Sequence, residues 1–303
     1  MMHTLHRLGE SIPFEDAIAS LLTVNIFAPI EWFLNHIFGA GMDVLADLLG
    51  TPMLGYPYMQ RAYLAAVCIA LIGPVVGTFL VHREMAMISD TLAHTAFAGV
   101  AVGLFLNSVL SLTLSPLLTA FVVAVVTALL VEVLVEHAGA YSDTSLAIVL
   151  TGGFAVGSIL ITATDGGIAV GIDAYLFGSL ATVSTENVGI LVLMSVIVGS
   201  LVTLAYRPLL YVTFDATAAR AARLNVRLYK RLMVVLTALV VVSAMQIMGV
   251  ILVAAMLVVP VAAAAQVAGS FKQSILLAVL AAEFAAIAGV TLSYVYGIAA
   301  GGS

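Results

Sequence analysis

The sequence predicts an all-α protein: a polytopic transmembrane bundle of about eight helices. Of its 303 residues, 63% are hydrophobic and only 9% are charged, whereas a soluble domain carries about 25% charged residues. The apolar residues also gather in runs of about 20, the length of helix that crosses the hydrocarbon core of a bilayer. The one cysteine, Cys68, excludes an internal disulfide framework or cysteine metal cluster.

Each predicted span is an apolar run with few charged residues. In chain order, the spans are 62–81, 88–106, 115–135, 144–163, 187–206, 231–247, 249–268 and 273–296. The sixth and seventh form one apolar block, which we expect to turn at "QIMG" (246–249). Residues 17–38 are interrupted by Asn25, Pro29, Glu31 and His36. That polar content favours an amphipathic helix on the outer surface, although a ninth crossing stays open.

Two regions follow from this pattern. Residues 1–56 form an N-terminal extension that is partly amphipathic, and residues 57–303 form the transmembrane domain. Six of the ten Lys and Arg residues lie between 207 and 231, so the positive-inside rule places this segment in the cytoplasm. Counting spans from it puts Arg83 and Lys272 inside as well, and the 164–186 loop outside.

Small residues predict where the helices approach one another closely. Three glycine pairs have the G-x-x-x-G spacing that lets helix backbones pack where lipid removes the hydrophobic driving force. These pairs are Gly73/Gly77, Gly99/Gly103 and Gly153/Gly157.

Asp90 and His94 are the candidate metal ligands. Their i, i+4 spacing places them on one helix face, and a carboxylate with an imidazole suits Zn²⁺, Mn²⁺ or Fe²⁺. Ionisable residues within a span mark a transport pathway by default, because burying them is expensive. Two other interpretations stay open: the pair forms a hydrogen bond that holds helices together, or Asp90 caps the helix.

The cytoplasmic segment 207–231 is much longer than the neighbouring connections, and "FDATAARAARLNV" (214–226) predicts a short helix followed by a turn. A segment of this length suits contact with a motor subunit. Neither Lys230 nor Lys272 follows a glycine, so the sequence contains no P-loop. The chain is therefore not expected to be an enzyme, and any ATP hydrolysis belongs to a partner.

Several stretches together resemble the permease subunits of manganese, zinc and iron ABC importers, the ABC-3 family. They are "GPVVGTFLVHREMAMISDTLAHTAFAGVAVGLFL" (73–106), "SDTSLAIVLTGGFAVGSIL" (142–160), "DAYLFGSL" (173–180), "FDATAARAARLNV" (214–226) and "MGVILVAAMLVVPVAAA" (248–264). In order and spacing they cover about residues 57–296. The family usually continues with a further apolar segment after the position of "GIAAGGS", where this sequence ends at Ser303.

The resemblance implies a type II-like permease in the cell membrane of a prokaryote. It implies a homodimer that works with two cytoplasmic ATPase subunits and an external metal-binding lipoprotein, without nucleic acid and without a covalently bound cofactor. The transported zinc, manganese or iron ion is the substrate, and Asp90 and His94 match metal-pathway positions. Residues 214–226 match the ATPase-coupling region, with Phe214, Asp215, Ala219 and Leu224 as the candidate coupling residues.

Four further acids are weaker candidates. Glu283 lies mid-span and either faces the translocation path or pairs with a hydroxyl group. Asp173, in the predicted outer loop, either gathers cations or is a solvated loop acid. Glu132 and Glu136 lie near the inner end of the third span, where we expect their side chains to reach the membrane interface.

Two rival functions also fit the sequence. A permease for a larger metal chelate, of the siderophore or cobalamin type, predicts a wide path without an Asp/His pair. A stand-alone secondary transporter with Asp90 and Glu283 as proton sites predicts uptake that depends on the proton gradient and needs no ATPase.

Overall fold

The computed structural model describes residues 28–110, 114–138, 142–163, 172–179 and 183–298, and the secondary structure of this part of the chain is helical throughout. Eight of the described helices are long and apolar enough to cross a membrane, which confirms the predicted number of spans. They are α4 (Pro57–His82), α5 (Met87–Leu110), α6 (Pro116–Ala138), α7 (Ser142–Thr162), α9 (Thr185–Leu204), α12 (Val226–Met248), α13 (Val250–Val267) and α14 (Phe271–Tyr296).

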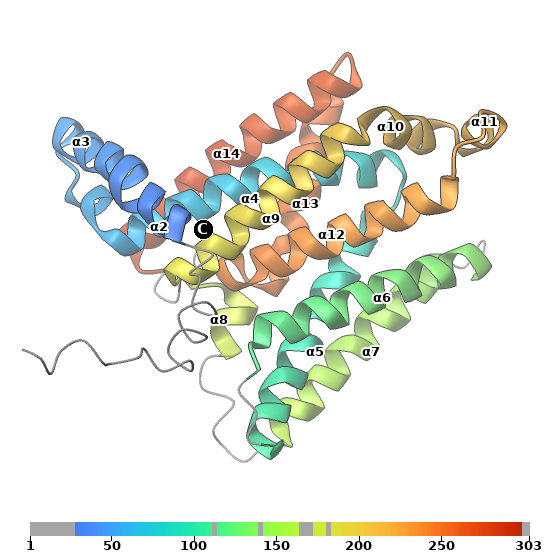
Figure 1. Ribbon diagram of the computed structural model, residues 1–303, viewed down its shortest axis with the longest axis horizontal. Helices are drawn as coiled ribbons and strands as arrows, with labels where there is room; N and C mark the ends of the chain where they lie inside the picture. The colour runs from blue at the N-terminus through green and yellow to red at the C-terminus, as the bar shows by residue number, and fades with distance from the viewer. Residues whose placement is uncertain (1–27, 111–113, 139–141, 164–171, 180–182, 299–303) are drawn as a thin grey trace, which may run out of the picture.

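Helix α4 forms the centre of the bundle, and α5 the centre of a second group. Helix α4 packs against α9, α12, α13 and α14, whereas α5 packs against α6, α7, α12 and α13. In Figure 1, α5, α6 and α7 lie together on one side of the molecule. The most apolar stretch of α4 is 72% buried and that of α7 only 11%, so α7 presents most of its surface outward.

The three glycine pairs occupy helix crossings. A Cβ on Gly99 would lie 2.7 Å from the Cα of Ala120 on α6, and one on Gly153 would lie 2.6 Å from the Thr95 side chain on α5. Gly77 lies against the backbone of Leu257 on α13. The predicted close packing is therefore confirmed, and it identifies α6, α5 and α13 as the partner helices.

The predicted turn at "QIMG" is also confirmed, since α12 ends at Met248 and α13 begins at Val250. Gly249 between them has a positive φ of 83°, which a residue with a Cβ adopts only under strain. A second glycine with positive φ, Gly178, lies directly after the short helix α8 (Ile172–Phe177). Its amide nitrogen would be 2.6 Å from a Cβ on Gly249, so α8 and the α12–α13 turn meet backbone to backbone.

The N-terminal helices follow one another without a break: α2 (Ala28–Phe33), the π-helix η1 (Leu34–Phe38) and α3 (Gly39–Leu49). Trp32, Ile37, Val44 and Leu48 are exposed along them. These helices are not among the eight that meet the length and hydropathy of a span. The part of the predicted 17–38 helix within the described residues, 28–38, is helical, and residues 17–27 lie outside them.

Candidate functional site

Asp90 and His94 lie where α5 is otherwise enclosed. From Ile88 to Ala101, they are the only two residues that are not buried. The Asp90 side chain is 42% exposed and that of His94 is 20% exposed. The small and apolar residues around them pack against α6, α7, α12 and α13, so the fold leaves only the carboxylate and the imidazole accessible along this stretch.

The two side chains point at each other without forming a hydrogen bond. His94 Nε2 lies 3.6 Å from Asp90 Oδ1, which is beyond a normal hydrogen-bond distance. The other ring nitrogen of His94, Nδ1, is buried and has no hydrogen-bond partner. The ring meets Phe154 of α7 edge to face, with centroids 5.3 Å apart. The geometry therefore does not favour a hydrogen bond as the purpose of the pair.

Helix capping does not account for Asp90 either. Helix α5 begins at Met87, so Asp90 lies within its first turn and not at the residue before it. A carboxylate in this position gains from the helix dipole, but this interaction requires no histidine.

The separation of the two atoms suits a shared metal ion. Two ligands about 2.1 Å from one ion and about 109° apart at the ion lie about 3.4 Å from each other, close to the 3.6 Å between Nε2 and Oδ1. No group of three or more His, Cys, Asp or Glu that could hold a metal occurs among the described residues. Two donors per protomer is an open ligand set, unlike the four-ligand cage of a structural zinc site.

Glu283 and Asp173 lie on other elements. Glu283 is half-buried in α14, which packs on α4 and α13, and it lies near Cys68 of α4. Asp173 lies in α8, which packs on α12 and α13. Among the described helices, neither α14 nor α8 is packed against α5, so the structure does not join these acids to the Asp90–His94 pair within one protomer.

The predicted coupling segment contains α10 (Tyr206–Phe214) and α11 (Ala216–Ala221). Asp215 joins these helices and caps α11, because its Oδ1 accepts hydrogen bonds from the amides of Thr217 and Ala218 at 2.9 and 2.8 Å. In Figure 1, α11 projects from the end of the molecule opposite to α3. The short helix predicted from "FDATAARAARLNV" is therefore present and prominent.

The four candidate coupling residues have different surroundings. Ala219 is fully buried in a small core with Val212 and Val226, against which Leu224 packs. Of the four candidates, Ala219 and Leu224 therefore hold α11 in place by apolar packing. Phe214 is 61% exposed, and its ring packs against Phe271 of α14 with a centroid distance of 5.6 Å.

That ring contact belongs to an aromatic cluster that the sequence gave no reason to expect. The ring centroid of Phe271 lies 5.1 Å from that of His82 and 5.0 Å from that of Phe79, both on α4. The ring centroids of Phe214 and His82 are also close, 5.9 Å apart. The cluster therefore links α10 in the coupling segment to two of the long helices, α4 and α14.

The prediction for Glu132 is wrong. The residue is only 5% exposed, because α6 packs against α5 and α12, so the side chain is enclosed and does not reach the interface. Glu136, one turn later, is exposed and pairs with Arg227 of α12, with 3.0 Å between Oε1 and Nε.

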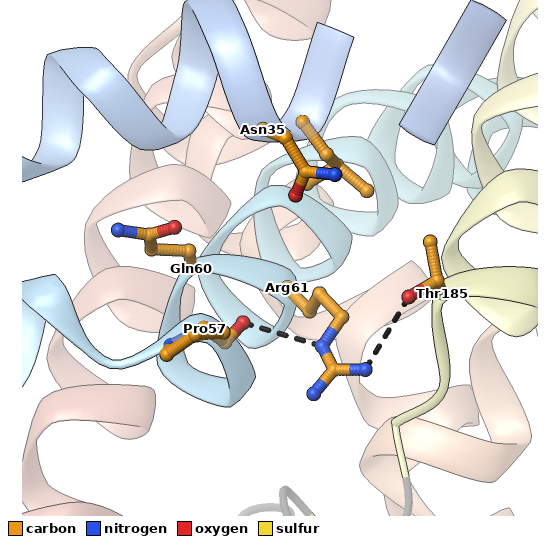
Figure 2. Close-up of a pocket in the computed structure, with 6 residues that line it drawn as sticks. Asn35, Pro57, Gln60, Arg61 and Thr185 are labelled. Atoms are coloured by element: carbon orange, nitrogen blue, oxygen red, sulfur yellow. Dashed lines mark hydrogen bonds between the residues drawn. The ribbon is translucent and has the colours of Figure 1, made fainter. Parts of the chain in front are cut away.

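A separate polar pocket of about 160 Å³ lies where α4 and α9 begin, at the predicted outer side. Figure 2 shows Arg61 at its centre. The guanidinium donates hydrogen bonds to the Pro57 carbonyl at 3.2 Å and to Thr185 Oγ1 at 3.4 Å. Its neighbour Gln60 donates to Asp43 Oδ1 at 2.9 Å, so the polar groups of this pocket are largely satisfied.

The fold is that of a polytopic membrane protein with an accessible Asp–His pair on one of its spans. The chain belongs to the ABC 3 transport family, which matches residues 55–303. It is therefore a multi-pass membrane subunit of a bacterial ABC import system and not an ATP-hydrolysing subunit. The resemblance predicted from the sequence is confirmed, and the stand-alone secondary transporter is excluded.

Two relatives show the range of the family. A manganese transport system membrane protein of Halalkalibacterium halodurans is 32% identical over 253 residues, covering 83% of this chain and 84% of the relative. A probable iron transport system membrane protein of Haemophilus influenzae is 28% identical over 241 residues, covering 80% of this chain and 86% of the relative.

Two solved structures share the architecture. PsaBC from Streptococcus pneumoniae, in complex with Fab, matches with a TM-score of 0.74 and 27% identity, over 85% of this chain and 90% of that chain. A putative metal-chelate type ABC transporter in an inward-facing conformation matches with a TM-score of 0.64 over 80% of each chain. Its identity is 16%, so it supports the fold alone.

Proposed function

We propose that this chain forms the translocation path for a divalent transition metal ion, with manganese the first candidate and iron and zinc the alternatives. The observation that carries the proposal is the open Asp90–His94 pair on an otherwise buried stretch of α5. The relatives named for manganese and iron transport support this substrate class. A permease for a larger metal chelate, the rival that the sequence also left open, is the alternative that the experiment below separates from it.

The working unit in this proposal is a homodimer with two cytoplasmic ATPase subunits and an external metal-binding protein. One protomer offers two donors, so a second copy facing the same path supplies two more, and water fills the remaining positions. Such a site binds an ion strongly enough to strip part of its hydration shell and weakly enough to release it, as conduction requires. The segment from α10 to α11 transmits the ATPase cycle through Asp215 and the small core around Ala219.

Uptake into proteoliposomes tests the proposal. The permease is reconstituted with its ATPase and binding protein, and radiolabelled manganese, iron and zinc are offered with and without ATP. We expect ATP-dependent uptake of at least one free ion that persists when the proton gradient is collapsed. Uptake of a ferric or cobalt chelate in preference to every free ion would favour the chelate permease.

A further inference from the structure

The His94 imidazole lacks the support that metal-binding histidines usually have. A histidine that binds a metal through one ring nitrogen almost always donates a hydrogen bond from the other, which fixes the orientation of the ring. In His94, Nε2 faces Asp90 Oδ1 at 3.6 Å, whereas Nδ1 is buried and makes no hydrogen bond to any described residue. A contact other than a hydrogen bond must therefore hold this ring in place.

An aromatic side chain of α7 lies against the imidazole. The rings of His94 and Phe154 meet edge to face, with centroids 5.3 Å apart and planes at 86°. Phe154 in turn stacks on Phe97 of α5, with centroids 5.7 Å apart and planes at 23°. Edge-to-face and offset-stacked pairs are the arrangements that aromatic rings prefer. The three rings thus form a continuous series of contacts that runs from the buried Phe97 to the candidate metal ligand.

The sequence of α7 brings Phe154 to this position. Gly153 and Gly157 flank it at the G-x-x-x-G spacing that lets two helix backbones approach closely. A Cβ on Gly153 would lie 2.6 Å from the Thr95 side chain of α5. A Cβ on Gly157 would lie 3.1 Å from the Phe97 ring. The phenylalanine between these glycines therefore lies where α7 and α5 are in close contact, within reach of the imidazole.

Phe154 is much more exposed than a core aromatic residue. Its exposed fraction is 40%, against 2% for Phe97. Val156 and Ile159 on the same helix are exposed as well, and single exposed apolar side chains need no special role. Phe154 differs from these two because it has a ring and places it against His94. Since much of its surface is accessible already, that ring adds little to the buried core.

We propose that Phe154 is a positioning residue for metal transport, whose ring holds the His94 imidazole so that Nε2 and Asp90 Oδ1 can bind the same ion. This inference rests on the proposed function. A ring contact restricts the imidazole less firmly than a hydrogen bond does, because it has no single donor–acceptor direction. The contact therefore supports the binding of an ion in transit and still lets the ligand turn away when the ion leaves, as conduction requires.

Equilibrium binding tests the inference without transport. The purified permease–ATPase complex, free of nucleotide, is dialysed against radiolabelled manganese, iron and zinc, and the ion that the parent binds most tightly is used for the variants. Phe154→Leu keeps an apolar side chain and removes the ring. We expect it to weaken binding about tenfold, the lower end of what the loss of an orienting partner costs.

Two further variants serve as controls for this measurement. Phe154→Tyr keeps the ring and should bind the ion within twofold of the parent. Val156→Ala shortens an exposed apolar side chain on the same helix, away from the imidazole, and should also bind within twofold. Recovery of binding by tyrosine, but not by leucine, identifies the ring itself as the feature that supports His94.

Thermal unfolding of the same preparations separates positioning from a structural role. Without metal, the Phe154→Leu complex should unfold at the temperature of the parent, because a largely accessible side chain contributes little buried apolar area. With metal, its midpoint should rise less than that of the parent, since a ligand stabilises the folded state in proportion to the logarithm of its affinity.

Two results overturn the inference and leave the proposed function standing. One is a Phe154→Leu complex that binds the ion within threefold of the parent. The other is a loss of binding that tyrosine does not restore or that accompanies a lower midpoint without metal, which assigns Phe154 a structural role. A parent complex that binds none of the three ions overturns the proposed function, and the inference fails with it.

Discussion

The Asp90–His94 pair and the pocket around Arg61 are both polar sites in an apolar protein, but their bonding differs. The Arg61 guanidinium is hydrogen-bonded to Pro57 and Thr185. His94 has one ring nitrogen without a partner and the other 3.6 Å from a carboxylate oxygen. The Arg61 pocket is therefore satisfied within the protein, whereas the Asp90–His94 pair keeps unused donors and acceptors, as the proposed role in binding a transported ion requires.

The largest expected effect follows from removing the open pair. Asp90→Asn keeps the shape and removes the charge, and His94→Ala removes the nitrogen ligand. Each should lower metal uptake about a hundredfold. Changing a residue that only orients a metal ligand already costs about ten- to a hundredfold in metal affinity, and the loss of a ligand itself costs no less. The complex should still assemble and show basal ATP hydrolysis, measured as phosphate release.

Asp143→Asn is the control for this experiment, since Asp143 is an exposed acid in the first turn of α7. It should leave uptake within twofold. Near-normal uptake by an Asp90→Asn/His94→Ala double variant would remove the contrast between the two polar sites.

The next effect concerns the cap of α11. Asp215→Ala removes the acceptor for the Thr217 and Ala218 amides, and losing such a cap costs about 1 kcal/mol. A six-residue helix has few other bonds to hold it, so we expect ATPase association and uptake to fall about tenfold. Asp215→Asn retains a capping oxygen and should behave like the parent in co-purification. Equal behaviour of the Ala and Asn variants would place the coupling contact elsewhere.

Packing of α5 comes third. Gly99→Ala puts a Cβ 2.7 Å from the Ala120 backbone, and overpacking of this kind costs about 1–3 kcal/mol. We expect a thermal midpoint several degrees lower, with uptake reduced in proportion to the folded complex. Gly152→Ala on α7 is the matched control, because nothing lies within 4 Å of its added Cβ. A stable Gly99→Ala variant would mean that α5 tolerates separation from α6.

The smallest effect is expected at the outer pocket. Arg61→Gln removes two hydrogen bonds, a loss of about 1 kcal/mol of stability per bond. Uptake should stay within twofold of the parent, since one bond lies within α4 and the other ties α4 to α9, and the proposed path does not use either. A tenfold loss of uptake with unchanged stability would instead make this pocket part of the transport path.

The sequence by itself determined the spans and the placement of Asp90 and His94 on one helix face. A helix in lipid must satisfy its backbone hydrogen bonds within itself, so each apolar run of sufficient length became a helix in the predicted place. The i, i+4 spacing likewise set Asp90 and His94 on one face of α5 before any packing was known. The glycine pairs identified which faces pack closely, but not the helices they meet.

Tertiary structure decided what depends on partners distant in sequence. Gly178 and Gly249 meet although they lie 71 positions apart in the chain, Phe214 reaches Phe271, and Glu132 is buried instead of reaching the interface. None of these is a property of a single helix, because hydropathy and periodicity describe each segment alone. Which helices cross, and which charges are enclosed when they do, is fixed by the packing of small residues between helices.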